Sequence, residues 1–192
     1  PVDTSLSSCN ENTYISHTFN LNMRHVSKKV NLSYGINVNP RHNATNYIFG
    51  PKMDKGLVTQ DLLNWSPGLN FRYRFSKRTS LNVRYHGNSN EPDIENLQEV
   101  IDKTNPQNVR YGNPALKPSF TNRMEANFNH YGEKTRRSLS AGFRYAVVSN
   151  EVSNMSLYES SSGIRVSKLM NVDGRHSLRA NLNFNTPLDS LQ

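Results

Sequence analysis

Residues 69–75 read Leu-Asn-Phe-Arg-Tyr-Arg-Phe, and this stretch decides the fold class. Its apolar side chains stand at Leu69, Phe71, Tyr73 and Phe75, and every position between them is polar or charged. Successive side chains of a β-strand point to opposite faces of a sheet. The alternation therefore predicts a strand with one apolar and one polar face.

The same period of two recurs along the chain and predicts about eight strands. They are expected at residues 12–24, 28–38, 57–75, 79–88, 119–131, 136–149, 161–171 and 175–185. The further apolar positions expected to share the face of Phe71 are Val83, Tyr85, Phe128, Phe143, Tyr145, Leu182 and Phe184. Most of these strands reach the ~10 residues that a tilted strand needs to cross a bilayer. Soluble strands usually stop near ~6 residues.

The connections alternate between short and long. The short ones lie near residues 25–27, 76–78, 132–135 and 172–174, and the long ones near 39–56, 89–118 and 150–160. Tight periplasmic turns and long outer loops are typical of outer-membrane barrels. The sequence therefore predicts an all-β, antiparallel, up-and-down transmembrane β-barrel segment, with the apolar face toward lipid and the polar face toward the lumen.

Composition and charge exclude several other classes. Apolar residues make up 34% of the chain, too few to fill a dry globular core easily. The net charge of +8 is spread over single positions and short turns, so we expect no nucleic-acid partner. Cys9 is the only cysteine, which excludes an intrachain disulfide. Because no apolar run approaches ~20 residues, any membrane residence must be as a barrel.

Motifs for catalysis or metal binding are absent from the sequence. The six histidines, at positions 17, 25, 42, 86, 130 and 176, have no metal-ligand spacing. There is no Gly-x-Ser-x-Gly motif, no Walker loop and no dinucleotide fingerprint. We therefore expect no enzyme activity, no metal and no cofactor.

Three residues disturb the alternating pattern. Pro67 lies inside a predicted strand and cannot donate to a ladder, so we expect a bulge or a strand end there. Asp61 and Lys168 fall in register with apolar residues. We expect Asp61 to lie above the membrane, and Lys168 to snorkel or to follow a register shift, because a Lys at mid-bilayer costs about 2–4 kcal/mol.

The segment after the fourth predicted strand carries a family resemblance. It reads Asn90-Glu91-Pro92, then Leu97-Gln98, Asn105-Pro106 and Gly112-Asn113-Pro114-Ala115-Leu116-Lys117-Pro118. Together with Asn171-Val172-Asp173-Gly174, this resembles the outer membrane β-barrel family of Bacteroidota, the barrel portion of TonB-dependent receptors. We interpret this motif as structural: its residues set the angle and register at which the loop re-enters the sheet. They are Gly112, Asn113, Pro114, Leu116, Lys117 and Pro118. Helical spacing after Pro92, at Ile94, Leu97 and Ile101, predicts one short helix.

The resemblance implies a transport function in the outer membrane. Residues 1–192 would form a single segment of a larger barrel, without the plug domain, in a receptor that imports a bulky nutrient such as an iron chelate or an oligosaccharide. The implied partners are outer-membrane lipid, the rest of the barrel, the plug, and TonB through an N-terminal region. From the residues themselves, ligand contacts are expected at Arg72, Arg74, Arg84, Tyr47, Tyr111 and Tyr158.

Two other interpretations remain open at this point. A soluble β-sandwich that acts as a surface-binding or adhesion module would turn the apolar residues toward each other between two sheets. A small closed barrel of eight strands would serve as a membrane anchor. Coordinates in which Phe71, Tyr73, Phe128 and Phe143 meet across a sealed centre would favour the sandwich.

Overall fold

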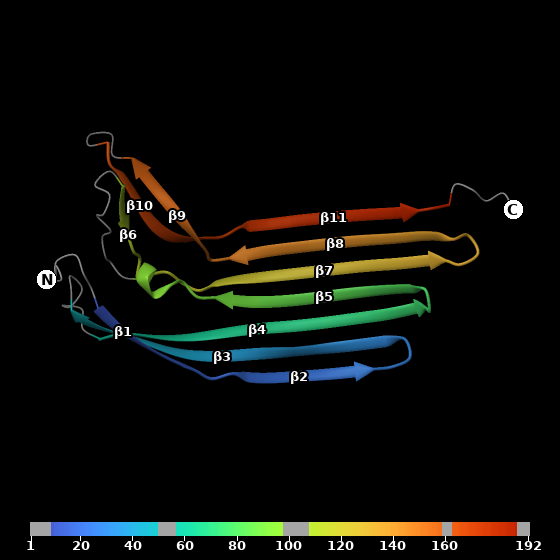
Figure 1. Cartoon of the computed structure of the whole chain (residues 1–192), viewed down its shortest axis with the longest axis horizontal. Helices are drawn as coiled ribbons and strands as arrows, with labels where there is room; N and C mark the ends of the chain where they lie inside the picture. Colours follow the sequence, from blue (N-terminus) through green and yellow to red (C-terminus); the bar gives the residue numbers. More distant parts are fainter. Residues whose placement is uncertain (1–8, 50–56, 98–107, 159–162, 188–192) are drawn as a thin grey trace.

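Most of the chain forms one large antiparallel sheet, here called the wall sheet (Figure 1). The computed structural model describes residues 9–49, 57–97, 108–158 and 163–187. The strands of the wall sheet are β1 (Cys9–Ser16), β2 (Phe19–Val26), β3 (Val30–Phe49), β4 (Leu57–Ser76), β5 (Thr79–Asn90), β7 (Ser119–Gly132), β8 (Arg137–Ser149) and β11 (Arg175–Asn185). The order is β1-β3-β4-β5-β7-β8-β11, and β2 also pairs with β3. All-β, mostly antiparallel architecture is thus confirmed.

The wall sheet is an open, up-and-down arrangement. Its neighbours are consecutive along the chain, except where β1 meets β3, β5 meets β7 and β8 meets β11. The turns that join β2 to β3, β4 to β5 and β7 to β8 lie together at the right-hand end in Figure 1, and β11 also ends there. In the described part of the chain, β11 pairs only with β8, and β1 and β2 pair only with β3. The two edges of this sheet therefore do not close on each other.

The first predicted strand, 12–24, is interrupted in the structure. β1 and β2 follow one register along β3, with Ser16 opposite Arg41 and Phe19 opposite Val38. The gap lies opposite Pro40, which has no amide hydrogen to donate. The His17 amide still donates to the Pro40 carbonyl at 3.0 Å. A single proline in the partner strand thus divides one strand into two.

The β3–β4 hairpin is longer than predicted. Residues 39–49 were expected in a loop, but β3 pairs with β4 from Val30 opposite Tyr73 to Asn46 opposite Leu57. The β4–β5 ladder ends earlier, at Gly68 opposite His86. The hairpin, with β1 paired along β3, therefore projects beyond β5 and the strands that follow it. Backbone pairing with β4 on one side and with β1 on the other holds residues 41–46 in a strand although they carry few apolar side chains. Residues 50–56 lie outside the described residues.

Pro67 does not end β4, and it causes no bulge against β3. It lies opposite Ile36 in an unbroken register. The effect of the proline falls on the other side, because pairing with β5 stops at the next residue, Gly68. A proline lacks the N–H that a second ladder would require. Pro67 therefore marks the point beyond which β4 no longer pairs with β5.

A second, small sheet lies beyond the left-hand end of the wall sheet in Figure 1. This end, opposite the short turns, is here called the long-connection end. It contains β6 (Asn108–Tyr111), β10 (Arg165–Val172) and β9 (Glu151–Tyr158). β9 and β10 are antiparallel, whereas β10 and β6 are parallel, an exception to the predicted antiparallel fold. The predicted short helix is a single 3-10 turn, η2 (Ile94–Leu97); Ile101 lies outside the described residues. In the described part of the chain, no helix is long and apolar enough to span a membrane.

The small sheet corrects the end of the predicted topology. Residues 161–171 were expected to cross the membrane, but β10 belongs to the small sheet, and β9 occupies the predicted loop 150–160. β11 pairs directly with β8, with Arg175 opposite Val148. The turn at 172–174 was therefore wrongly assigned to the periplasmic side, because it lies at the long-connection end. Lys168 neither snorkels nor shifts register within the wall sheet, because it lies in β10, where it is exposed.

No sealed apolar centre exists in the described part of the chain. Its only buried hydrophobic residues are Leu169, in β10 of the small sheet, and Leu116, in the segment before β7. In the wall sheet, Phe143 is 43% exposed and Leu182 is 70% exposed. A β-sandwich would bury these side chains between two sheets. The arrangement therefore disagrees with the soluble-sandwich interpretation.

Candidate functional site

The eleven residues predicted to face lipid all lie on one face of the wall sheet, here called the apolar face. Residues directly opposite each other in a ladder share a face, and Phe71 is opposite Val83, while Ala126 is opposite Phe143. Aromatic rings pack side by side on this face. The ring centroids of Tyr73 and Phe75 are 4.7 Å apart. The alternation in the sequence is thus realised as two unlike faces.

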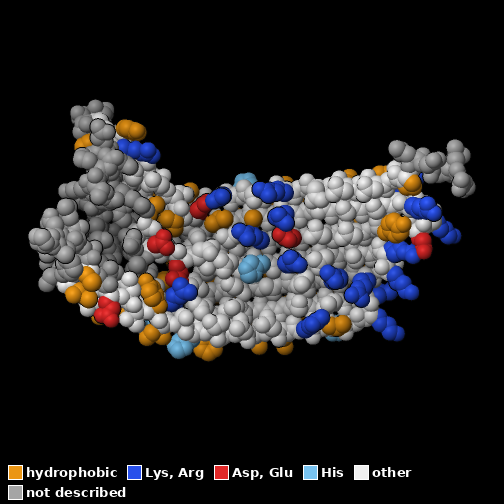
Figure 2. All heavy atoms as spheres, in the orientation of Figure 1, with side chains coloured by type: hydrophobic (Ala, Val, Ile, Leu, Met, Phe, Trp, Pro, Cys, Tyr) orange, Lys and Arg blue, Asp and Glu red, His pale blue; other side chains and the backbone are white. Residues whose placement is uncertain are grey.

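The other face, here called the polar face, carries a row of charges across four adjacent strands. Arg84 of β5 is opposite Glu125 of β7, Glu125 is opposite Arg144 of β8, and Arg144 is opposite Arg179 of β11. Figure 2 shows this face, with charged side chains gathered over its middle. The row exists because all four residues have the same parity in an unbroken register. One carboxylate lies among three guanidinium groups, so the row has a net positive charge.

Glu125 is the centre of the charged row. Its Oε1 accepts from Arg144 Nε at 2.8 Å, and its Oε2 lies 3.9 Å from Arg84 Nη1. The Glu125 side chain is 26% exposed, whereas those of the two arginines are 56% and 57% exposed. Solvent screening limits such pairs to about 1 kcal/mol. Their main effect is to fix the guanidinium groups in place on an otherwise polar surface.

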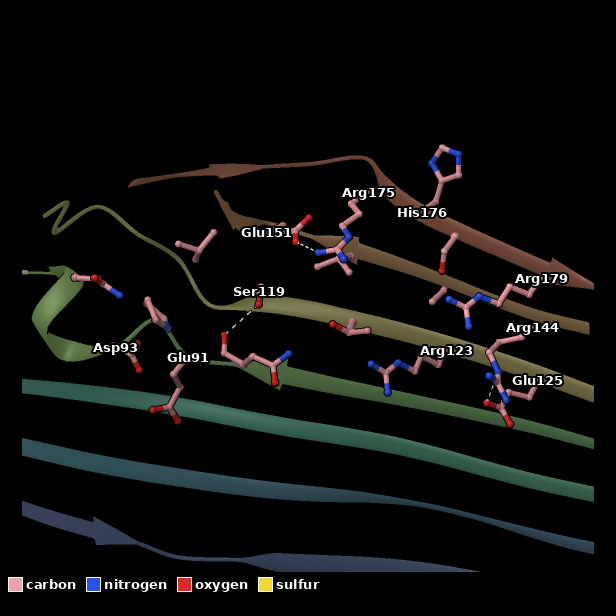
Figure 3. A pocket seen from close by; sticks show the side chains of 18 residues that line it. Glu91, Asp93, Ser119, Arg123, Glu125, Arg144, Glu151, Arg175, His176 and Arg179 are labelled. Carbon is pink, nitrogen blue, oxygen red and sulfur yellow. Dashed lines mark hydrogen bonds and ion pairs between the residues drawn. The ribbon is translucent and has the colours of Figure 1, made fainter. Parts of the chain in front are cut away.

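A hollow of about 810 Å³ lies on the polar face next to this row. Figure 3 shows side chains from β7, β8, β9 and β11 around it, together with Glu91 and Asp93 from the segment after β5. Arg175 forms an ion pair with Glu151 at its upper border. The hollow thus combines fixed arginines, carboxylates and hydroxyl groups, which suit a polar or charged ligand surface.

Glu91 connects this hollow to the projecting hairpin. Its side chain is 13% exposed, and its Oε2 lies 3.4 Å from Arg41 Nη1 of β3. The amide of Asn64 in β4 donates to the other carboxylate oxygen. Glu91 therefore holds the segment after β5 against the hairpin. A second hollow of about 720 Å³ lies on the hairpin side of this segment, and Asp93 lines both hollows.

The predicted ligand contacts are scattered over the structure. Of the six, only Arg84 belongs to the charged row. Arg72 lines a separate hollow of about 320 Å³, together with Arg24. The remaining three with described side chains are Arg74 near the β4–β5 turn, Tyr111 in β6 and Tyr158 in β9. Tyr47 lies in β3, opposite Asn10.

Sequence reasoning missed the site residues Glu125, Arg179 and Glu151. Glu125 and Arg179 are ordinary polar positions in alternating strands, and Glu151 lies in a segment that was expected to be a loop. Only the register of the ladders shows that Glu125 lies between two arginines. Among the described residues, no group of three or more His, Cys, Asp or Glu side chains could hold a metal ion.

The two family-like motifs in the sequence contact each other. The side-chain amide of Asn113 donates to the Leu169 carbonyl at 2.8 Å. The backbone amide of Lys117 donates to Asn171 Oδ1, also at 2.8 Å. Asn171 in turn donates to the carbonyls of Lys117 and Asn150, at 3.0 and 2.8 Å. These bonds attach the small sheet to the segment that leads directly into β7. The motif thus has a visible structural role at a loop-to-strand junction.

Comparison with known proteins identifies the family. The family model described as "Outer membrane protein beta-barrel family" matches residues 50–191. The chain belongs to the outer membrane protein beta-barrel family. Its place is therefore the cell outer membrane, as the strand pattern predicts.

Two solved structures share the fold. The siderophore receptor PirA from Pseudomonas aeruginosa matches with a TM-score of 0.59 and 10% sequence identity, over 96% of this chain and 41% of the receptor. The copper transporter OprC matches with a TM-score of 0.63 and 12% identity, over 93% of this chain and 28% of the transporter. A search of curated proteins finds no match. The chain thus spans less than half the length of either solved relative.

Proposed function

We propose that the chain forms part of the barrel of an outer-membrane TonB-dependent receptor that imports a bulky nutrient, such as an iron chelate or an oligosaccharide. The observation that carries this proposal is the wall sheet itself, with one apolar and one polar face and no covering layer in the described part. Such a sheet is stable where lipid covers one face and an aqueous lumen lies against the other. The proposal includes no catalytic role.

The height of the apolar face supports this placement. Aromatic pairs lie at both ends of it: Trp65 stacks on Phe120 at 4.5 Å, and Phe75 packs near Phe128 at 6.4 Å. Trp65 and Phe75 are ten positions apart in β4, or about 33 Å along the strand. A strand tilt of about 40° reduces this to about 25 Å, the usual height of the apolar band of an outer-membrane barrel between its aromatic girdles.

The charges of the polar face suit a transport pathway. Arg84, Arg144 and Arg179 present fixed positive charge along one row. In a narrow, enclosed lumen such charges act more strongly than they would in bulk water. They favour anionic groups, whether on a cargo or on a plug domain that fills the lumen. The nutrient pathway would therefore pass the hollow shown in Figure 3.

The open edges fit the role of a segment. Unpaired edges of β2 and β11 are templates for further strands, which the rest of a larger barrel would supply. We expect an isolated segment to self-pair or aggregate in water. A closed barrel of eight strands would instead require β2 and β11 to pair, and these strands do not meet here.

Nutrient uptake tests the proposal. Bacteria that lack the full-length protein should lose import of at least one substrate from a panel of ferric chelates, copper salts and oligosaccharides. A protonophore should abolish the same import in the parent strain, because TonB-driven transport depends on the proton gradient. Parental uptake of the whole panel by the deletion strain, or uptake that is insensitive to the protonophore, would contradict the proposal.

A further inference from the structure

The short turns of the wall sheet carry most of the net positive charge of the chain. Residues 27–29, 76–78 and 133–137 connect β2 to β3, β4 to β5 and β7 to β8; these segments are here called the turn rim. Their basic residues are Lys28, Lys29, Lys77, Arg78, Lys134, Arg136 and Arg137, and their only acid is Glu133. The turn rim therefore carries a formal charge of +6, out of +8 for the whole chain. Figure 2 shows Lys and Arg side chains gathered at this end.

These charges are largely without acidic partners. All seven basic residues are exposed. Within the described part of the chain, the ion pair between Arg78 and Glu133 is the only one in the turn rim. Clustered like charges repel one another, so a cluster with few partners favours binding of an external anion. By contrast, acids such as Asp61, Glu91 and Glu151 lie toward the opposite end of the sheet.

The position of the turn rim indicates the kind of anion. Phe75 and Phe128 form the aromatic pair at the end of the apolar face nearest the short turns. Both lie within a few residues of the turn rim in the sequence. Lys77 follows Phe75 by two residues, and the Tyr73 ring packs edge-on against the Phe75 ring. An aromatic belt followed directly by cations is the arrangement of a protein surface at the level of lipid headgroups. A partner dissolved in the periplasm would not require the cations to lie beside the apolar band.

We propose that the turn rim binds the anionic phosphate headgroups of phospholipids in the periplasmic leaflet of the outer membrane. This inference rests on the placement in the membrane proposed above. Each flexible Lys or Arg side chain extends from the end of a strand to the headgroup plane, while the aromatic residues remain at the edge of the hydrocarbon. The rim would set the depth of the sheet in the bilayer and enrich anionic lipid around it. One cation near the headgroup plane favours an anionic lipid about fivefold.

Lipid selectivity in reconstituted membranes tests the proposal. The full-length protein is incorporated into phosphatidylcholine bilayers that contain a trace of spin-labelled phosphatidylglycerol or spin-labelled phosphatidylcholine. Electron spin resonance then gives the relative affinity of each label for the protein surface. We expect a preference for phosphatidylglycerol of about twofold, because the fivefold effect at the rim is averaged with lipid along the neutral band. Raising the salt to ~1 M should remove the preference.

Two triple variants provide the comparison. K28Q/K77Q/K134Q removes three exposed cations, lowers the formal charge of the turn rim from +6 to +3, and should weaken the preference measurably. K117Q/R165Q/K168Q removes three exposed cations from the opposite end and should leave it unchanged. Equal affinity for both labels in the wild type, or a preference that is unchanged in the rim variant, would overturn the proposal.

Other outcomes separate this inference from the proposed function. If neither spin-labelled lipid is immobilised by the protein, the wall sheet does not contact lipid, and the membrane placement itself fails. If both are immobilised equally, the placement stands and the turn rim lacks headgroup selectivity. Purified peptidoglycan provides a further check. Retention of the wild type but not of the rim variant on peptidoglycan, without any lipid preference, would assign the rim to the cell wall and overturn the lipid proposal.

Discussion

Replacing Ala126 with lysine should destabilise the protein strongly if the apolar face meets lipid. Ala126 lies on that face in β7, opposite Val83 on one side and Phe143 on the other. It is close to the middle of the band between Phe120 and His130. A lysine at the bilayer midplane costs about 2–4 kcal/mol. We expect the free energy of unfolding to fall by about that amount, measured by guanidinium titration of the full-length protein in lipid vesicles.

Two matched lysine variants isolate the effect of lipid. Asn127→Lys places the same charge one residue further on, on the polar face opposite Asn82 and Gly142, and should cost less than about 1 kcal/mol. His130→Lys stays on the apolar face but lies at its turn end, where the cost falls to about 0–1 kcal/mol. The expected order of destabilisation is therefore Ala126→Lys well above the other two.

The reasoning would be refuted by equal costs at positions 126 and 127. A soluble sheet with both faces in water would tolerate a lysine equally at either position. An equal loss at 126 and 130 would show that the cost does not depend on depth. In that case the apolar face would be buried against protein and not against a bilayer.

Two further substitutions test contacts at the long-connection end. Asn171→Ala removes three hydrogen bonds that attach the small sheet, worth about 2–3 kcal/mol together. Hydrogen exchange at the Lys117 amide should therefore speed up at least about 30-fold, while Asn154→Ala, at an exposed position of β9, should leave it unchanged. Gly87→Ala would bring a Cβ within 2.8 Å of two neighbouring rings. The midpoint of thermal unfolding should drop, in line with about 1–3 kcal/mol of overpacking. Gly68→Ala meets nothing within 4 Å and should have little effect. Unchanged exchange in the first variant, or equal midpoints for the two glycine variants, would contradict these contacts.

Strands of the wall sheet could be predicted because their alternation is a local signal. The predicted strands 79–88 and 119–131 lie within β5 and β7, with ends that differ by one or two residues. The predicted strand 28–38 covers the first part of β3, which begins at Val30. Each side chain on these strands faces one of two unlike surroundings, and its apolar or polar character indicates which one. The same signal cannot report the partner strand. Val166 in β10 alternates with polar neighbours as a wall strand does, yet it pairs within the small sheet.

Features that depend on the partner strand were missed for the same reason. Residues 39–49 have few apolar residues and suggested a loop, but their backbone pairs with β4 and with β1. The break before Phe19 is caused by Pro40, which is distant in sequence. Local composition carries no information on either effect.

The candidate site was predictable only in part. The cationic character of the polar face follows from Arg84 and Arg144 at alternate positions, which the sequence shows directly. Their common partner Glu125 depends on the register between β5, β7 and β8. The hydrogen bond from Asn113 to the Leu169 carbonyl depends on β10 lying in the small sheet and not in the wall sheet. Registers and departures of this kind are set by long-range pairing, and a single sequence does not specify them.

Site-directed spin labelling along β8 tests the central claim most directly. In a cysteine-free background, single cysteines from Ser138 to Val148 are labelled in the full-length protein in lipid vesicles. Accessibility to oxygen, which concentrates in lipid, is compared with accessibility to a water-soluble nickel complex. We predict two opposite alternations of period two, with oxygen highest at the odd positions, which include Phe143, and nickel highest at the even ones, which include Arg144. Alternations in phase with each other, or no oxygen maximum at the odd positions, would contradict the two-faced membrane wall.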